Sequence, residues 1–409
     1  MTSYLGWLDY SEHERKKMLD VIQVLGGDRD TRDELGIGTV RDALAHLLFP
    51  GISTIQTRAR YFLFVPWMYL DLERRRISSS EMAARARREE TRLIETLATA
   101  EDQAGVIGIE ARANLKRLPS NVYWQGLGIW GIRLFEGGQD AYHLSLDNYY
   151  RRSATRDLTT SEQAADRDPV SRSWHPALPP APEEFPAQAD FSLSLSEADY
   201  LRDRVLQRVP GTLLAFLVDR AHPWTGTDFP WMHPQLAEFP AHNREQLRHA
   251  ELFALIMFGA SLLYNLMLAD LAERAELQED YASEFEAWSI RIRENMTELR
   301  NWNLSLFWNV VDSNRDRVPF PTRRFVEDWI GLVLNAADPG ALARSQNARD
   351  LIRYREIRLK RAQARLENRN ALSQWGGAAG AFELNYRWGK AQSIILDILQ
   401  GLSKGAAHA

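Results

Sequence analysis

A run of arginines near the C-terminus is the strongest candidate in the sequence for contact with a ligand. It lies in the segment NARDLIRYREIRLKRAQARLENRN, which has the composition of a helix. On one continuous helix, four side chains would share a stripe at angles of about 0°, 300°, 340° and 20°: Arg358, Arg361, Arg365 and Arg369. Such a basic edge could neutralise phosphates of DNA or RNA. The alternative is a solvated face paired with Glu356, Glu367 or another helix.

A second candidate surface precedes an apolar segment in the first quarter of the chain. The stretch TIQTRARYF follows an expected short helix and the turn FPGIS, loosely the layout of a helix-turn-helix motif. In that layout the side chains of Gln56, Arg58 and Arg60 would occupy the first helical turns and reach base edges. Ordinary packing and ion pairing are the alternative, because many helical proteins join two helices by such a turn.

One histidine pattern raises the question of a metal site. In AHNREQLRHAE, the side chains of His242, Glu245 and His249 stand at positions i, i+3 and i+7, within about 60° of one another on a helix. Two turns separate the histidines by roughly 10.5 Å, too far for one metal ion without further ligands. We therefore expect surface polar residues here and no metal centre.

No familiar catalytic or cofactor motif supports an enzyme. The sequence contains no GxxxxGK[ST], no GxSxG, no HExxH and no GxGxxG that follows a strand. It also has no Cys, which excludes disulfides, thiolate nucleophiles and iron–sulfur clusters. We therefore assign no catalytic residue and expect no cofactor.

Composition and charge indicate a globular, intracellular protein. Apolar residues make up 45% of the 409 positions and charged residues 26%, a balance typical of folded chains. The formal net charge of −5 means that nucleic acid or anionic lipid would have to bind a local patch. The apolar run 252–268 is shorter than the ~20 residues of a membrane span. With no apparent signal peptide, we expect a cytoplasmic protein without a membrane partner.

The elements that must position these residues are almost all helical. Helical spacing predicts a long helix from Ser53 or Thr54, another over 80–101, and a continuous apolar stripe from Phe285 to Val310. Sustained alternation is absent, so the fold is expected to be mainly α and multi-helical, with at most minor strands near 142–150.

Proline content divides the chain. The stretch 153–190 contains six prolines and few aliphatic residues, as in an extended connector. We therefore predict an N-terminal helical domain over 1–152, a proline-rich connector over 153–190 and a C-terminal helical bundle over 191–409. The fold class is then two helical subdomains joined by that connector.

Four motifs resemble a prokaryotic family of unknown function. They are GWLDYS, DELGIGTVRDALAHLLFPG, STIQTRARYFLFVPWMY and LPSNVYWQGLGIWGIR, and the resemblance covers nearly the whole chain. Members of that family tend to be encoded in genomic islands with helicases, phospholipase-D-like nucleases and other anti-phage components. The resemblance implies a role in antiviral defence, with such a helicase or nuclease as partner, and it supplies no catalytic residues.

These observations favour an accessory, non-enzymatic subunit of an anti-phage defence or DNA-processing system. It would bind a partner protein and also nucleic acid through a local basic patch. Two alternatives remain open: a nuclease or other hydrolase whose site is assembled from dispersed carboxylates, His and Arg, and a DNA-binding regulator that reads sequence with Gln56, Arg58 and Arg60.

Overall fold

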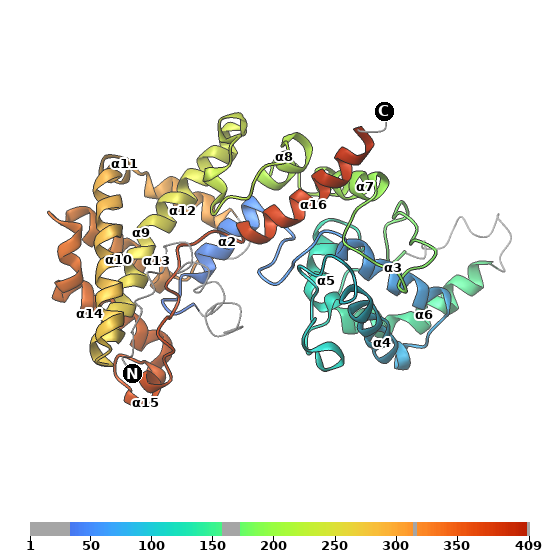
Figure 1. Cartoon of the computed structure of the whole chain (residues 1–409), viewed down its shortest axis with the longest axis horizontal. Coiled ribbons are helices and arrows are strands. Elements are labelled where there is room, and N and C mark those ends of the chain that lie inside the picture. Colours follow the sequence, from blue (N-terminus) through green and yellow to red (C-terminus); the bar gives the residue numbers. More distant parts are fainter. Residues whose placement is uncertain (1–32, 158–171, 314–316, 407–409) are drawn as a thin grey trace, which may run out of the picture. The chain divides into compact units, whose positions relative to one another are not determined.

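The protein is mainly α, as predicted. The computed structural model describes residues 33–157, 172–313 and 317–406. Within these ranges there is no strand, and one isolated antiparallel bridge joins Arg133 to Trp174. The stretch 142–150, where minor strands were allowed for, belongs to helix α6 (Gln139–Asp157) (Figure 1).

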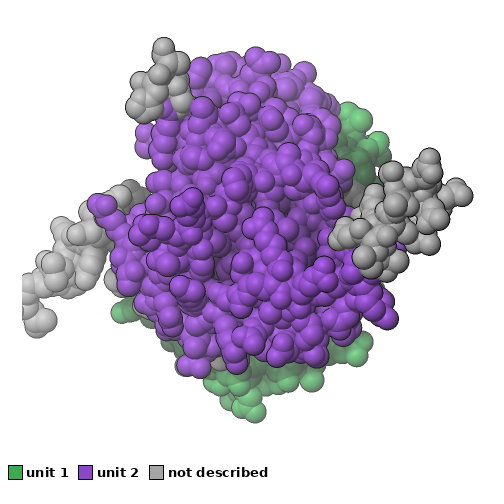
Figure 2. Space-filling view, turned by 90° about the vertical axis from the view of Figure 1, so that its right-hand side faces the viewer, with its two compact units in different colours: residues 1–43, 249–384 green, residues 44–248, 385–409 purple. Residues whose placement is uncertain are grey.

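The chain forms two compact units, each built from two separate stretches of sequence (Figure 2). The first unit comprises Met1–Ala43 and His249–Leu384, and the second comprises Leu44–Arg248 and Asn385–Ala409. Two of the three boundaries fall within helices α2 (Gly38–Leu48) and α9 (Ala241–Leu271), and the third lies between Leu384 and Asn385. The described part of the predicted connector, 172–190, lies inside the second unit.

The first unit is a bundle around the apolar half of α9. Its other elements, in chain order, are α10 (Ala275–Glu294), α11 (Met296–Asn301), α12 (Leu304–Asp312), α13 (Phe320–Asn335), the 3-10 helix η4 (Pro339–Arg344), α14 (Gln346–Lys360), the 3-10 helix η5 (Arg361–Gln363) and α15 (Arg369–Ser373). Helix α13 packs against α14, and η4 packs against both α10 and α14. These contacts hold α14 on the bundle (Figure 1).

Two tryptophans attach neighbouring helices to the backbone of α9. Trp288 Nε1 donates to the Leu255 carbonyl and Trp329 Nε1 to the Ile256 carbonyl, each at 2.8 Å. A Cβ at Gly259 would overlap the Trp288 ring, so this glycine permits the close approach. Within the described residues, α9 is the one helix long and apolar enough to cross a membrane, and 89% of its most apolar window is buried in protein.

The second unit contains the remaining helices. They are α3 (Tyr61–Arg74), α4 (Ser79–Leu97), η1 (Arg112–Asn114), α5 (Pro119–Ile129), α6, α7 (Leu195–Arg208), α8 (Leu213–Arg220), η2 (Pro230–Met232), η3 (Leu236–Glu238) and α16 (Trp388–Ala406). Helix α3 packs against α4 and α5, and α16 packs against α7 and α8. The C-terminal helix therefore completes a core that begins near residue 44.

Two helical predictions need correction. The helix expected from Ser53 or Thr54 begins only at Tyr61, since residues 53–60 form turns. The stripe from Phe285 to Val310 is divided among α10, α11 and α12, and Asn303 caps α12 by accepting from the Leu306 amide at 3.1 Å. The stripe does not continue in register through α12, because Leu306 is 45% exposed and α12 buries Phe307, Trp308 and Val311 instead. The helix predicted over 80–101 is confirmed as α4.

Candidate nucleic-acid interface

The predicted arginine stripe is not one helical face. Helix α14 ends at Lys360, and Arg361 caps it with a φ of 51°, in the left-handed region that helices do not continue through. Arg358 therefore stands in the last turn of α14, Arg361 in η5, and Arg369 at the start of α15. The prediction of a continuous edge is wrong because the chain reverses between the second and third arginines.

A buried carboxylate produces that reversal. Glu356 is 0% exposed, and its two oxygens accept from the backbone amides of Arg365 and Leu366, each at 2.9 Å. The Tyr264 hydroxyl also donates to Glu356, and Lys360 Nζ lies 3.1 Å from its Oε1. Burial alone would raise the pKa of Glu356, but these donors and the Lys360 charge hold it below its usual value. The carboxylate thus stays ionised and fixes the returning chain.

Arg365 belongs to this internal network. Its guanidinium pairs with Glu34 at 3.0 Å, and Glu34 also pairs with Lys360. Burial raises the pKa of the Tyr264 hydroxyl between these groups, and the neighbouring Glu356 charge raises it further. Arg365 is therefore a structural residue that positions the segment, with its charge already compensated.

The other three arginines differ from Arg365 in that each side chain is exposed and, among the described residues, forms no hydrogen bond or ion pair. We call them the arginine surface: Arg358, Arg361 and Arg369. The carboxylates suggested as their partners are occupied elsewhere, Glu356 as above and Glu367 by Arg353 at 3.5 Å. The stretch 344–370 contains nine basic and three acidic residues, a formal charge of +6 in a chain of −5. Several of these cations are paired or buried, and the three of the arginine surface are the ones left to suit a polyanion.

The side chains of Gln56, Arg58 and Arg60 are placed quite differently. Gln56 is 1% exposed, donates to the Gly51 carbonyl and accepts from the Ser53 amide, both at 3.1 Å. It therefore closes the turn ahead of α3 and has no access to a base. The sequence signal for this role is the Pro50-Gly51 pair, which demanded a tight turn.

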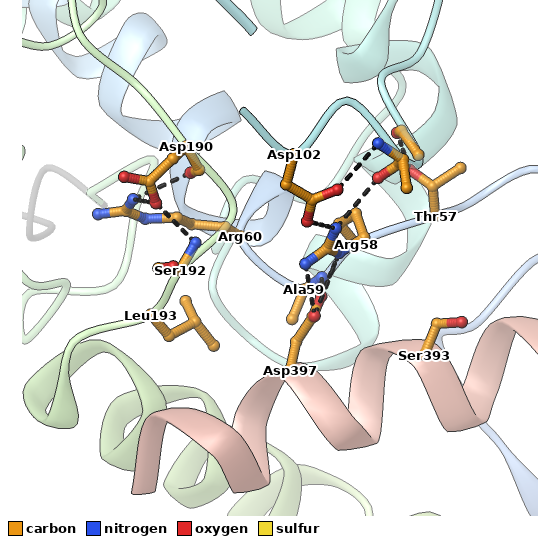
Figure 3. A network of polar contacts seen from close by, with 12 residues as sticks. Thr57, Arg58, Ala59, Arg60, Asp102, Asp190, Ser192, Leu193, Ser393 and Asp397 are labelled. Carbon is orange, nitrogen blue, oxygen red and sulfur yellow. Dashed lines mark hydrogen bonds and ion pairs between the residues drawn. The ribbon is translucent and has the colours of Figure 1, made fainter. Parts of the chain in front are cut away.

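Arg58 is held between two carboxylates (Figure 3). Its Nε lies 3.0 Å from Asp397 Oδ2, and its NH1 lies 2.6 Å from Asp102 Oδ2. Asp397 also accepts from the Ala59 amide at 2.8 Å. Burial raises the pKa of Asp397 despite the opposing effect of Arg58, whereas the hydrogen bond from Arg58 lowers the pKa of the exposed Asp102. Arg58 therefore joins α16 to the start of α3.

Arg60 forms ion pairs with two carboxylates at the wall of a cleft. Its guanidinium lies 3.0 Å from Asp190 Oδ1 and 2.9 Å from Glu197 Oε1. The cleft has a volume of about 1140 Å³ and runs between the end of α4 and the loop 182–192. Among the described residues that line it, Arg60 is the one cation, against five carboxylates: Glu101, Asp102, Glu183, Glu184 and Asp190. A surface of this sign repels phosphates, so the two arginines stabilise the second unit instead of presenting positive charge.

The histidine pattern on α9 leads to separate contacts. His242 Nε2 lies 2.6 Å from the Gly211 carbonyl, and His249 Nδ1 accepts from Trp302 Nε1 at 2.8 Å. No group of three or more His, Cys, Asp or Glu side chains within the described ranges is arranged to hold a metal ion.

Comparison with known proteins gives a family for nearly the whole chain. No curated protein and no solved structure matches the chain. The model of a family of unknown function, DUF6361, matches residues 2–400. The chain therefore belongs to this family.

Proposed function

We propose that this protein is an accessory, non-enzymatic helical subunit of an anti-phage defence or DNA-processing system. In this proposal it binds a partner protein and holds nucleic acid against the arginine surface. The observation that carries the nucleic-acid part is the contrast between Arg365, whose charge is compensated by Glu34, and Arg358, Arg361 and Arg369, whose charges are not. The defence context and the partner, a helicase or phospholipase-D-like nuclease encoded nearby, are supported by the family resemblance of the sequence motifs.

Three features make phosphate the fitting ligand for this surface. Guanidinium groups bind phosphate oxygens in a bidentate manner and keep their charge at any physiological pH. The returning chain is fixed by the buried Glu356, so the surface needs little ordering when a ligand binds. The excess of positive charge is local, which permits binding although the whole chain is acidic.

The nucleic-acid part is tested by titrating the full chain with labelled oligonucleotides at several salt concentrations. In the double variant R358A/R361A, we expect weaker binding and a salt slope, d log K/d log [salt], smaller in magnitude by about 2, because each lost phosphate contact removes about one unit. The matched control is R88A/R92A, which removes two exposed arginines four residues apart on α4. Equal losses in both variants would contradict a specific role for the arginine surface.

The partner is tested by capturing the protein from its native host, with and without nuclease treatment, and identifying what is retained by mass spectrometry. A helicase or nuclease in stable ratio after nuclease treatment supports a direct protein contact. Retention that nuclease abolishes indicates a bridge of nucleic acid, and capture of neither protein nor nucleic acid contradicts the accessory-subunit proposal.

A further inference from the structure

An exposed aromatic side chain stands beside the arginine surface on the same helix. Tyr354 is 68% exposed and precedes Arg358 by four residues on α14, so the two side chains lie about 40° apart around the helix axis. Among the described residues, its ring forms no hydrogen bond and no ring contact. A large, flat, unpartnered ring next to an uncompensated guanidinium is therefore available to a ligand.

The two residues that follow Tyr354 fix the backbone that carries it. The next residue, Arg355, is buried, and its guanidinium donates to the Leu35 carbonyl at 2.7 Å and to the Gly36 carbonyl at 2.9 Å. The residue after that is the buried Glu356, which holds the returning chain. The ring thus projects from a rigid position, and a ligand that binds it loses little freedom of the protein.

A second exposed ring comes from a segment that Arg355 joins to α14. Phe320 is 72% exposed and is the first residue of α13. Arg355 donates to the Pro321 carbonyl at 3.1 Å and to Thr322 Oγ1 at 2.9 Å, which attaches the first turn of α13 to α14. Arg355 therefore anchors the first turn of α13, which carries the exposed Phe320, to the same helix that carries Tyr354 and Arg358.

From this combination we infer that the arginine surface binds single-stranded nucleic acid, with an unpaired base stacked on Tyr354 and flanking phosphates at Arg358 and Arg361. In a duplex each base is stacked between its neighbours, so its face is not accessible to the ring of Tyr354. A single strand exposes base faces, and proteins that bind it combine aromatic platforms with cationic tracks. The inference rests on the proposed function and specifies the ligand class for the same surface.

The experiment compares three labelled ligands of equal length with the full chain: a single-stranded oligothymidylate of 20 nucleotides, a duplex, and an abasic 20-mer that keeps only the phosphates. Y354A should weaken oligothymidylate binding by roughly 5-fold to 100-fold, the range of one lost stacked base. It should leave the duplex and the abasic strand unchanged, while Y354W should retain binding. The control is L144A, which removes a 74% exposed apolar side chain from α6.

The outcomes separate the inference from the proposed function. If R358A/R361A weakens all three ligands while Y354A weakens none, the arginine surface binds phosphate without stacking and the single-strand inference is overturned. If wild-type protein binds no oligonucleotide at all, the nucleic-acid part of the proposed function fails as well. If Y354A abolishes capture of a partner protein but leaves oligothymidylate binding intact, the ring is a protein contact and the inference is again wrong.

Discussion

Glu356 and Arg365 stand nine residues apart, and the carboxylate of the first accepts the backbone amide of the second at 2.9 Å. This contact turns the chain back along α14 and separates the arginines that helical spacing had placed on one stripe. The Glu356 side chain is fully buried, and a backbone amide left unpaired there would lower the stability of the fold.

We predict that Glu356→Gln strongly destabilises the first unit. The amide loses the negative charge beside Lys360, and its nitrogen cannot accept from the backbone amides, so a buried donor is left unpaired. Breaking one side of such a buried network costs about 3 kcal/mol of unfolding free energy. Urea unfolding of the full chain followed by circular dichroism measures the change. Glu367→Gln, at an exposed pair of 3.5 Å, should change the free energy by less than about 0.5 kcal/mol.

We predict that stability falls between pH 4.5 and 7 because of Glu90 in the second unit. Its buried carboxyl accepts from the Ser120 amide and hydroxyl at 2.7 Å, and burial raises its pKa from 4.5 to about 7. Since the folded state keeps this proton to a higher pH than the unfolded state, the stabilisation is complete below pH 4.5 and is lost on passing pH 7. The total is roughly 3 kcal/mol.

The comparison of wild type with Glu90→Gln isolates this effect. Burial also raises the pKa of Glu73 and Asp397, but both groups remain in the variant. Unfolding free energies measured from pH 4.5 to 8 should therefore slope less steeply in Glu90→Gln. Parallel slopes would show that Glu90 does not carry the dependence.

We predict that the two carboxylates around Arg58 contribute very unequally to stability. Asp397→Ala removes a buried partner and leaves the Ala59 amide and Arg58 Nε unpaired, which should cost about 3 kcal/mol. Asp102→Ala removes an exposed partner of the same guanidinium and should cost less than about 1 kcal/mol. Thermal and urea unfolding of both variants give the ranking, and similar costs would contradict it.

We predict opposite effects for two glycine substitutions in the first unit. Gly259→Ala forces the Trp288 ring off the backbone of α9 and should destabilise by about 2 kcal/mol. Gly331→Ala, within α13, meets nothing within 4 Å and should stabilise by about 0.5–1 kcal/mol because alanine favours the helix. Melting temperatures should move in opposite directions, and a shared direction would refute the packing account.

Local patterning predicted the helical elements better than the long-range contacts between them. The helical class and α4 follow from spacing and capping that act within a few turns. The left-handed turn at Arg361 depends instead on Glu356, Tyr264 and Glu34, the last more than 300 residues away along the chain. Helical spacing alone cannot reveal a partner so distant in the sequence. The four arginines therefore looked equivalent, although the charge of Arg365 is compensated by Glu34.

The same reasoning explains the positions of Arg58 and Arg60. Their neighbours in sequence suggest a helix start, and nothing nearby reveals that Asp397, Asp190 and Glu197 meet them in the folded chain. A signal within reach of sequence analysis was Tyr354, because its four-residue spacing from Arg358 already puts an aromatic ring beside a cation.

The pairing of Arg58 with Asp397 has a consequence for synthesis on the ribosome. The two residues are separated by 339 positions, and α16 packs on α7 and α8 only after its own codons have been translated. At ~5–20 residues per second, a nascent chain carries the uncovered surfaces of α7 and α8 for roughly 10–40 s before α16 follows. During that interval chaperones can bind the apolar faces of α7 and α8. Ribosome-bound intermediates of this protein should therefore be enriched in bound chaperones.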